Sequence, residues 1–168
     1  MSEVLDIIMK RRSIRKYSFE KVTDEEIKKL VTAGMCAPSA RDLRPVRFIA
    51  VNERECLNKL AQASPYAGML REATLCIAVL GDRGSSDEYW RDDCAAATEN
   101  ILIEATALGL GSCWTAVTPN EQKIKAVSEV LGLPKNIIPY CLIAIGHSGE
   151  EKQARDKFDA KNLRMNRW

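Results

Sequence analysis

The sequence predicts a helix-rich α+β fold built as a single domain. Its 168 residues match the usual length of about one domain. Amphipathic stretches that follow capping residues indicate helices, and short, continuously apolar runs indicate buried strands. The strands are too scattered for the regular strand–helix alternation that is typical of a parallel sheet.

The first helix is predicted at the N-terminus. Ser2 can cap its first turn, and Val4, Leu5 and Ile8 share one face of a helix that runs to about Arg11. A basic stretch follows directly. We refer to residues 11–17 as the basic segment.

A second helix is predicted to begin at Thr23, because Glu26 stands three residues later and the two can form a capping box. It should end before Pro38, since the residue preceding a proline avoids the helical region. A loop over residues 37–45 then leads to a buried strand over residues 46–51.

The middle of the chain is predicted to contain a short helix over residues 54–63 and a strand over 74–80. This strand is continuously apolar, so we expect cover on both faces. After a turn over 81–86, the longest helix is expected over 87–108, starting at Asp87. Its alanines favour close approach of a neighbouring helix, and Gly109 is expected to end it.

The last third is predicted to contain a strand or extended loop over 112–117, a helix starting at Pro119, and a final strand over 137–145. Residues 147–168 are highly charged and cannot form a core alone, so they are either disordered or laid along another surface. Four apolar anchors favour the second alternative: Phe158, Leu163, Met165 and Trp168. We therefore define a domain over residues 1–146 and a tail that belongs to it.

Charge and hydropathy exclude several classes of protein. Twenty-five basic and 23 acidic residues give a net charge of +2, which argues against a surface built for nucleic acid. No apolar run approaches the roughly 18 residues of a membrane-spanning helix. The N-terminus places acidic residues before basic ones, the reverse of a signal peptide, so we expect a cytoplasmic protein.

The cysteines and the histidine restrict the chemistry. None of the six cysteines is paired at the spacing of a zinc or thioredoxin-like motif. We interpret them as buried, reduced thiols, with a redox-sensing or nucleophilic cysteine as the alternative. His147 is the only histidine, and the G-x-S-x-G motif is absent. We therefore assign no metal site and no catalytic side chain, and expect an organic cofactor.

Two segments contain groups that could bind a ligand. The basic segment carries four cations and a hydroxyl within six residues, and guanidinium groups match phosphate oxygens. Alternatively, these cations complement a helix C-terminus; nucleic-acid binding is disfavoured, since few aromatic residues are interleaved. The loop from Pro38 to Pro45 could line a ligand ring or be a plain connector. Gly109–Trp114 follows a helix and lacks a third glycine, which excludes a dinucleotide-binding turn.

Taken in this order, the segments resemble the flavin-dependent nitroreductase family over nearly the whole chain. R-R-S-I-R-K-Y is similar to that family's phosphate motif. A-P-S-A-R-D-L-R-P-V-R-F-I-A-V resembles its A-P-S-S-x-N-x-Q-P-W-x-F-I-V-V segment. W-R-D-D-C-A-A-A-T-E-N-I-L-I-E-A-T-A-L-G-L-G-S-C-W resembles its long central helix and the turn after it. The endings I-A-I-G-H-S-G, A-R-D-K-F-D and N-R-W are similar to those of its shorter members.

The resemblance implies bound FMN and assigns residues to parts of that cofactor. The phosphate and ribityl chain would be held by Arg11, Arg12, Ser13 and Arg15. One edge of the isoalloxazine ring would be lined by Pro38, Ser39, Ala40 and Asp42. N5 and the pyrimidine oxygens would lie near the backbone of Trp114, Thr115, Ala116 and Val117. A pair that reaches the phosphate from the tail would be Arg155 and Lys157.

The resemblance also implies an architecture. The family fold has three layers, α/β/α, with a mixed, mostly antiparallel sheet between helices. Its members are homodimers with FMN at the subunit interface and tails that embrace the partner. This would explain a tail without a core, and would make the site composite.

Three positions depart from the family pattern. Asp42 replaces an asparagine, Arg44 a glutamine and Val46 a tryptophan. An ionised Asp42 could only accept, for example from flavin N3–H. Arg44 could place positive charge near the N1–O2 edge of the ring and raise the flavin potential. Alternatively, Asp42 and Arg44 could pair with each other.

The resemblance implies an oxidoreductase that passes hydride from NADH or NADPH through FMN to a nitroaromatic, a quinone or a similar small acceptor. The alternatives are a specialised flavoenzyme with another acceptor and an FMN-binding protein for storage or sensing. The sequence identifies neither the acceptor nor the preferred dinucleotide, nor the role of Cys113.

Overall fold

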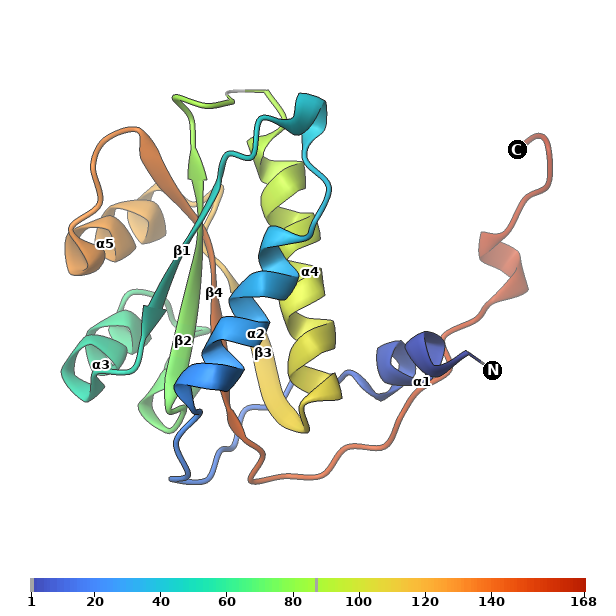
Figure 1. Ribbon diagram of the computed structural model, residues 1–168, viewed down its shortest axis with the longest axis horizontal. Coiled ribbons are helices and arrows are strands. Elements are labelled where there is room, and N and C mark those ends of the chain that lie inside the picture. The colour runs from blue at the N-terminus through green and yellow to red at the C-terminus, as the bar shows by residue number, and fades with distance from the viewer. Residues whose placement is uncertain (1, 87) are drawn as a thin grey trace.

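The computed structural model describes residues 2–86 and 88–168, and its centre is a four-stranded antiparallel sheet (Figure 1). The strands are β1 (Val46–Val51), β2 (Leu75–Asp82), β3 (Leu110–Ala116) and β4 (Ile137–His147), in the order β1-β2-β4-β3. β2 and β4 are therefore central, and β3 forms one edge.

The sheet is more regular than the mixed sheet we expected. Every pairing between the four strands is antiparallel. Among the described residues, parallel pairing occurs in an isolated bridge between Ser13 and Ser112, where the basic segment meets β3. The expectation of a mixed sheet is therefore corrected to an antiparallel sheet with one short parallel contact at its edge.

The odd-numbered residues of β2 face two long helices. Leu75, Ile77 and Val79 are fully buried and pack with residues of α2 (Asp24–Met35) and α4 (Trp90–Ala107). Successive side chains of a strand point to opposite faces, so this face forms one apolar layer.

The even-numbered residues of β2 face the other way. Cys76, Ala78 and Leu80 pack with residues of α3 (Arg54–Gln62) and α5 (Glu121–Leu131). Helices therefore cover both faces of the sheet (Figure 1), which confirms the α/β/α layers and the double cover expected for this apolar strand.

Most helix boundaries follow the capping residues. Thr23 N–H donates to Glu26 Oε2 at 2.7 Å within the capping box that starts α2. α5 begins two residues later than predicted, because Asn120 caps its first turn and Pro119 therefore precedes the helix. The predicted start of the longest helix, Asp87, lies outside the described residues; α4 begins at Trp90.

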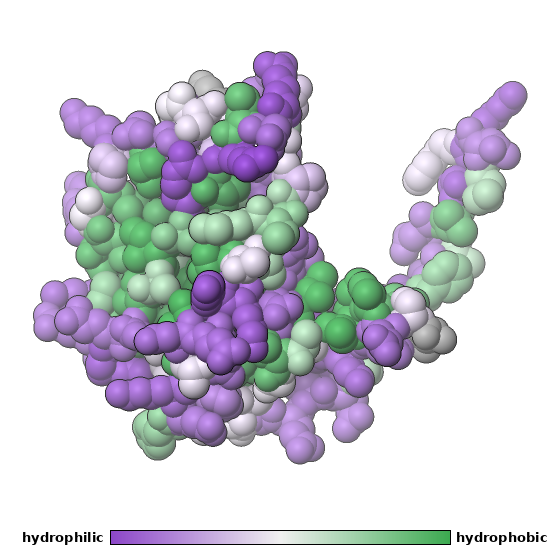
Figure 2. All heavy atoms as spheres, viewed as in Figure 1, coloured by the Kyte–Doolittle hydropathy of each residue, from purple (hydrophilic) through white to green (hydrophobic). Residues whose placement is uncertain are grey.

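The N-terminal helix and the tail lie to one side of the sheet (Figure 1). α1 spans Glu3–Lys10, and Figure 2 shows apolar side chains on both segments. Phe158 is 76% exposed and Trp168 fully exposed. The tail anchors therefore do not pack on the core of their own chain. Within the described residues, three short 3-10 turns span Ala40–Asp42, Gly68–Arg71 and Ala160–Asn162.

Gly81 allows the sheet to approach α4. A Cβ atom at this position would lie 2.1 Å from Cε3 of Trp90, which is 2% exposed and cannot easily move. We expect Gly81→Ala to destabilise the fold by about 1–3 kcal/mol, as overpacking of a core does. Urea unfolding measures the loss.

Gly68→Ala is the matched control, because its Cβ would meet only the guanidinium end of Arg71 at 3.4 Å. Equal unfolding midpoints for the two variants would contradict the assignment of Gly81 as a contact glycine.

Candidate functional site

The basic segment lies against the open edge of β3. Ile14 N–H donates to the Ser112 carbonyl at 2.9 Å, and Ser18 N–H donates to the His147 carbonyl at 2.9 Å. Gly111 permits this approach, since a Cβ there would lie 2.7 Å from Cγ2 of Ile14. The N-terminal chain is therefore fixed along the sheet rather than free in solution.

The Tyr17 side chain also holds the basic segment against the sheet. Its hydroxyl donates to the Ile14 carbonyl at 2.6 Å and lies 3.2 Å from the Ala144 carbonyl. Burial raises the pKa of Tyr17 above its ordinary value, so the hydroxyl stays a neutral donor. Residue 15, between these anchors, is consequently held in a defined place.

The first part of the tail binds the other side of the basic segment. Gly149 N–H donates to the Lys16 carbonyl at 2.8 Å, and Lys152 Nζ donates to the Ser13 carbonyl at 2.6 Å. The backbone N–H of Arg15 donates to Glu150 Oε1 at 2.7 Å. The tail and the basic segment thus form one hydrogen-bonded unit.

Two further contacts extend this unit towards α1. The guanidinium of Arg12 donates to the carbonyl of Gln153, and Arg155 N–H donates to the Met9 carbonyl at 3.2 Å. They bring the tail pair Arg155 and Lys157 beside Arg11, around a cavity of about 520 Å³. Three of the predicted phosphate ligands, Arg11, Arg155 and Lys157, therefore lie around one cavity, whereas Arg15 lines another.

That second cavity, the β3 groove, has a volume of about 630 Å³ and runs along the edge strand. One side is formed by the predicted residues Arg15, Trp114, Thr115 and Ala116, together with Cys113. The other side is formed by Pro65, Tyr66, Gly68, Met69, Glu72 and Lys123. Val117 is buried and donates its N–H to the Tyr140 carbonyl at 3.1 Å, so it does not line the groove.

The residues of β3 present polar backbone groups to the groove. Ser112 directs its carbonyl to Ile14 across the open edge, and the Ala116 carbonyl lies 3.5 Å from Lys123 Nζ on the same side. Alternate residues of a strand direct their N–H and C=O groups to the same edge. Trp114, between the two, therefore also directs its backbone into the groove.

The wall over residues 64–72 was missed by the sequence reasoning. It contains no apolar periodicity, and its available signal was Pro65 and Gly68, which mark a turn without indicating a ligand. Lys123 was missed because it stands in the first turn of a helix, where its side chain reads as an ordinary surface cation.

The predicted ring-binding loop lies away from this groove, beside α4. Ser39 Oγ donates to Asp93 Oδ2 at 2.8 Å and accepts from Arg44 N–H at 2.8 Å, and Ala40 N–H donates to Asp93 Oδ1 at 3.1 Å. Asp93 is 5% exposed. The backbone of this loop has positive φ angles at Arg41, Asp42 and Arg44, a conformation that is unfavourable for residues other than glycine.

Asp42 and Arg44 pair with each other. Arg44 Nε and Nη2 donate to the two Asp42 carboxylate oxygens at 2.6 and 2.8 Å, and this bond holds the pKa of Asp42 below its ordinary value. Of the two interpretations of these residues, pairing is the one that the structure shows. Both side chains are exposed, so their charge is screened by water.

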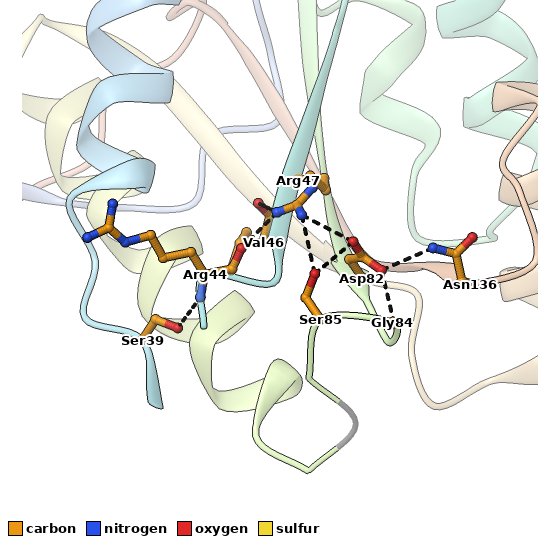
Figure 3. Close-up of polar contacts among 8 residues, drawn as sticks. All are labelled: Ser39, Arg44, Val46, Arg47, Asp82, Gly84, Ser85 and Asn136. Carbon is orange, nitrogen blue, oxygen red and sulfur yellow. Dashed lines mark hydrogen bonds and ion pairs between the residues drawn. The ribbon is translucent and has the colours of Figure 1, made fainter. Parts of the chain in front are cut away.

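A polar network fixes the end of this loop to β2, as Figure 3 shows. Arg47 donates to the Arg44 carbonyl at 2.7 Å and to Asp82 Oδ2 at 3.1 Å, and Asn136 donates to Asp82 Oδ1 at 3.0 Å. The Arg44 side chain extends away from this network. Pro38, Ser39 and Arg44 line a third cavity, of about 230 Å³.

The predicted site residues that line a cavity are thus divided among three cavities of one chain. These are the cavity at Pro38, Ser39 and Arg44, the β3 groove, and the α1–tail cavity at Arg11, Arg155 and Lys157, and they share no lining residue. The remaining predicted residues line none of the three: Arg12, Ser13, Ala40, Asp42 and Val117. A single chain does not bring all of them around one ligand.

The cysteines are mostly buried thiols. Four of the six thiols are buried, and burial raises the pKa of Cys141 to about 12, whereas Cys36 is exposed. Cys113 is buried at the groove, where burial raises its pKa and the nearby Arg15 partly opposes that rise. Among residues 2–86 and 88–168, no cluster of three metal-ligating side chains exists, and no helix could span a membrane.

Fold and site together define a class: an α+β protein with helices on both faces of an antiparallel sheet and a groove along the edge strand, where Arg15 of the basic segment lies. The model of the nitroreductase family matches residues 8–65 and 58–147. The chain belongs to this family.

Individual relatives agree over the full length. A protein from Archaeoglobus fulgidus, provisionally named NADH dehydrogenase/NAD(P)H nitroreductase, is 41% identical over all of both chains. An FMN-dependent nitroreductase from Clostridium difficile is 34% identical, with a TM-score of 0.93 over 98% of this chain and 99% of that one. A provisionally named nitroreductase from Desulfovibrio desulfuricans, solved in complex with FMN, is 28% identical, with a TM-score of 0.85 over 100% and 99%.

The bond between Glu150 and the basic segment predicts an acid-sensitive contact. The Arg15 N–H, and then Lys152, hold the pKa of Glu150 below its ordinary value of 4.5. A lowered pKa in the folded state contributes stability above the ordinary value, and this contribution is lost as the pH falls through the lowered one. Glu150→Gln should therefore be less stable than the parent at neutral pH, with a difference that shrinks in acid.

Thermal unfolding between about pH 7 and about pH 3 measures this difference. Glu151→Gln, at an exposed neighbouring position, is the control. A stability difference for Glu150→Gln that does not change with pH would show that the carboxylate charge contributes nothing.

Proposed function

We propose that the chain is an FMN-dependent NAD(P)H oxidoreductase that acts on a nitroaromatic, a quinone or a similar small acceptor. The observation that carries the proposal is the β3 groove. It is lined by the edge strand and by Arg15, whose backbone N–H is bonded to Glu150. The names of the relatives from C. difficile and A. fulgidus support both FMN and NAD(P)H.

The charge at the Arg15 end of the groove suits the phosphate of FMN. Among the described residues, no carboxylate lies within 4.0 Å of the Arg15 guanidinium, whereas Arg11 lies 3.8 Å from Glu99. An arginine with free donors suits a phosphate. The strand backbone at Trp114 offers polar groups to the edge of a flat ring, and the neighbouring Ala116 carbonyl lies 3.5 Å from Lys123 Nζ.

A homodimer forms part of the proposal. α1 exposes Val4, Leu5 and Ile8, and the tail exposes four more apolar side chains. Such apolar surface is typical of an interface. We therefore propose that residues 147–168 embrace the partner of the 1–146 domain, and that the partner's 38–44 loop completes the groove of this chain. The separation of the cavities within one chain supports a composite site.

FMN, when bound, supplies hydride transfer between the dinucleotide and the acceptor. The protein's own residues bind and orient. Arg15, with Arg12 and Ser13 beside it in the chain, would neutralise the phosphate, and β3 would fix the ring. Arg11, Arg155 and Lys157 line a different cavity of this chain, so in the composite site they would reach the phosphate from the partner subunit. The 38–44 loop, with Pro38, Ser39, Ala40, Asp42 and Arg44, would close the ring edge. No protein acid is needed, because solvent can supply protons. A cytoplasmic location is proposed too, supported by the free thiols.

The visible spectrum of the purified protein tests the proposal, followed by anaerobic addition of NADH or NADPH. We expect a flavin band that bleaches on addition of dinucleotide. A band that does not bleach would support storage or sensing instead. No flavin band, even after incubation with FMN, would refute the proposal.

Arg15→Gln tests the phosphate end of the groove. Loss of one charge-assisted contact, worth about 1.5–3 kcal/mol, should weaken FMN binding by about 10- to 100-fold. Quenching of FMN fluorescence on titration measures the dissociation constant. Lys16→Gln removes the same charge one residue away, at an exposed position. If both variants bind FMN equally well, the phosphate does not lie at Arg15.

A further inference from the structure

One end of the β3 groove is closed by an aromatic and a cationic side chain from different elements. Lys123 Nζ lies 5.1 Å from the centroid of the Tyr66 ring and 3.5 Å from the Ala116 carbonyl. Tyr66 belongs to the wall after α3, whereas Lys123 belongs to the first turn of α5. The two side chains therefore meet on the side of the groove that faces β3, and Lys123 reaches across to the Ala116 carbonyl of that strand.

The Lys123 ammonium has no acidic partner in the part of the chain that the structure describes. No carboxylate lies within 4.0 Å of it, in contrast to Lys125 on the same helix, which lies 3.9 Å from Glu129. A cation in the first turn of a helix also opposes the helix dipole. The helix dipole therefore does not stabilise the charge of Lys123, and its ammonium group lines the β3 groove.

The two cations of the groove lie at different ends of β3. Arg15 follows Ile14, which bonds Ser112, and Lys123 approaches Ala116. Four residues of strand separate these points, or about 13 Å at about 3.3 Å per residue. The two cations are therefore anchored near opposite ends of the strand. If Arg15 holds the FMN phosphate, Lys123 is left for a second anion.

We infer that Lys123 and Tyr66 form the docking site for the phosphate-bearing part of the nicotinamide dinucleotide that reduces the flavin. This inference rests on the proposed function. Lysine binds phosphate as a point charge, and the Tyr66 ring, 72% exposed, offers a flat surface on which a base or nicotinamide can stack. A neutral quinone or nitroaromatic has no anion for Lys123 to bind.

Steady-state kinetics of the FMN-loaded dimer with NADH and with NADPH tests the inference. For Lys123→Gln we expect the KM of the dinucleotide to rise about tenfold, with kcat and the KM of a neutral quinone within about twofold of the parent. The dissociation constants of NAD+ and NADP+, followed by perturbation of the flavin spectrum, should rise by the same factor. Lys123→Arg should largely restore binding.

Two further variants sharpen the test. Lys125→Gln removes an equal charge from the exposed face of α5 and should leave every constant unchanged. Tyr66→Leu should weaken both dinucleotides without removing charge. A larger loss for NADPH than for NADH would identify the 2′-phosphate as the group bound, and equal losses would identify the pyrophosphate.

Unchanged dinucleotide constants in Lys123→Gln would overturn the inference. So would a shifted FMN affinity or flavin potential with unchanged dinucleotide constants, because Lys123 would then face the flavin. Both results are distinct from failure of the proposed function, in which neither dinucleotide bleaches the flavin of the parent protein.

Discussion

The attachment of the basic segment to the edge of the sheet is the contact on which the rest of the site depends. Ile14 bonds β3, where it needs the missing side chain at Gly111, and Tyr17 reaches β4, where a Cβ atom at Gly146 would lie 3.1 Å from its Cδ1. The segment in turn supplies the carbonyls and N–H groups that bind the start of the tail. One contact with the sheet thus positions Arg15, one side of the groove and the direction in which the tail leaves.

The layered core explains why the binding surfaces lie at edges. Both faces of β2 and β4 are covered by helices, and their side chains are almost entirely buried. A ligand cannot enter such a closed core. Open backbone remains at β3, and a sharply turned loop remains before β1, where Asp93 of α4 supplies the hydrogen bonds that the loop cannot make itself.

Local signals in the sequence were sufficient for most of the fold. The Thr23–Glu26 capping box and the continuously apolar run of β2 depend on neighbours in sequence, and both were predicted correctly. The predicted start of α5 was wrong by two residues, because the Asn120 side chain caps the first turn and leaves Pro119 outside the helix. The site was harder. The contact between Ser39 and Asp93 joins residues 54 positions apart in the sequence. Lys123 is recognised as a site residue only from its contact with the Tyr66 ring, and no local sequence pattern connects these two residues.

The bond between the Arg15 backbone and Glu150 has a thermodynamic consequence. The residue proposed to hold the cofactor phosphate and the tail proposed to hold the second subunit are joined by a single hydrogen bond. Any free energy by which FMN favours the ordered segment must also favour the ordered tail, and the linkage is reciprocal. Dilution of the protein would then release flavin, and added flavin would drive assembly, with the same coupling factor in both directions.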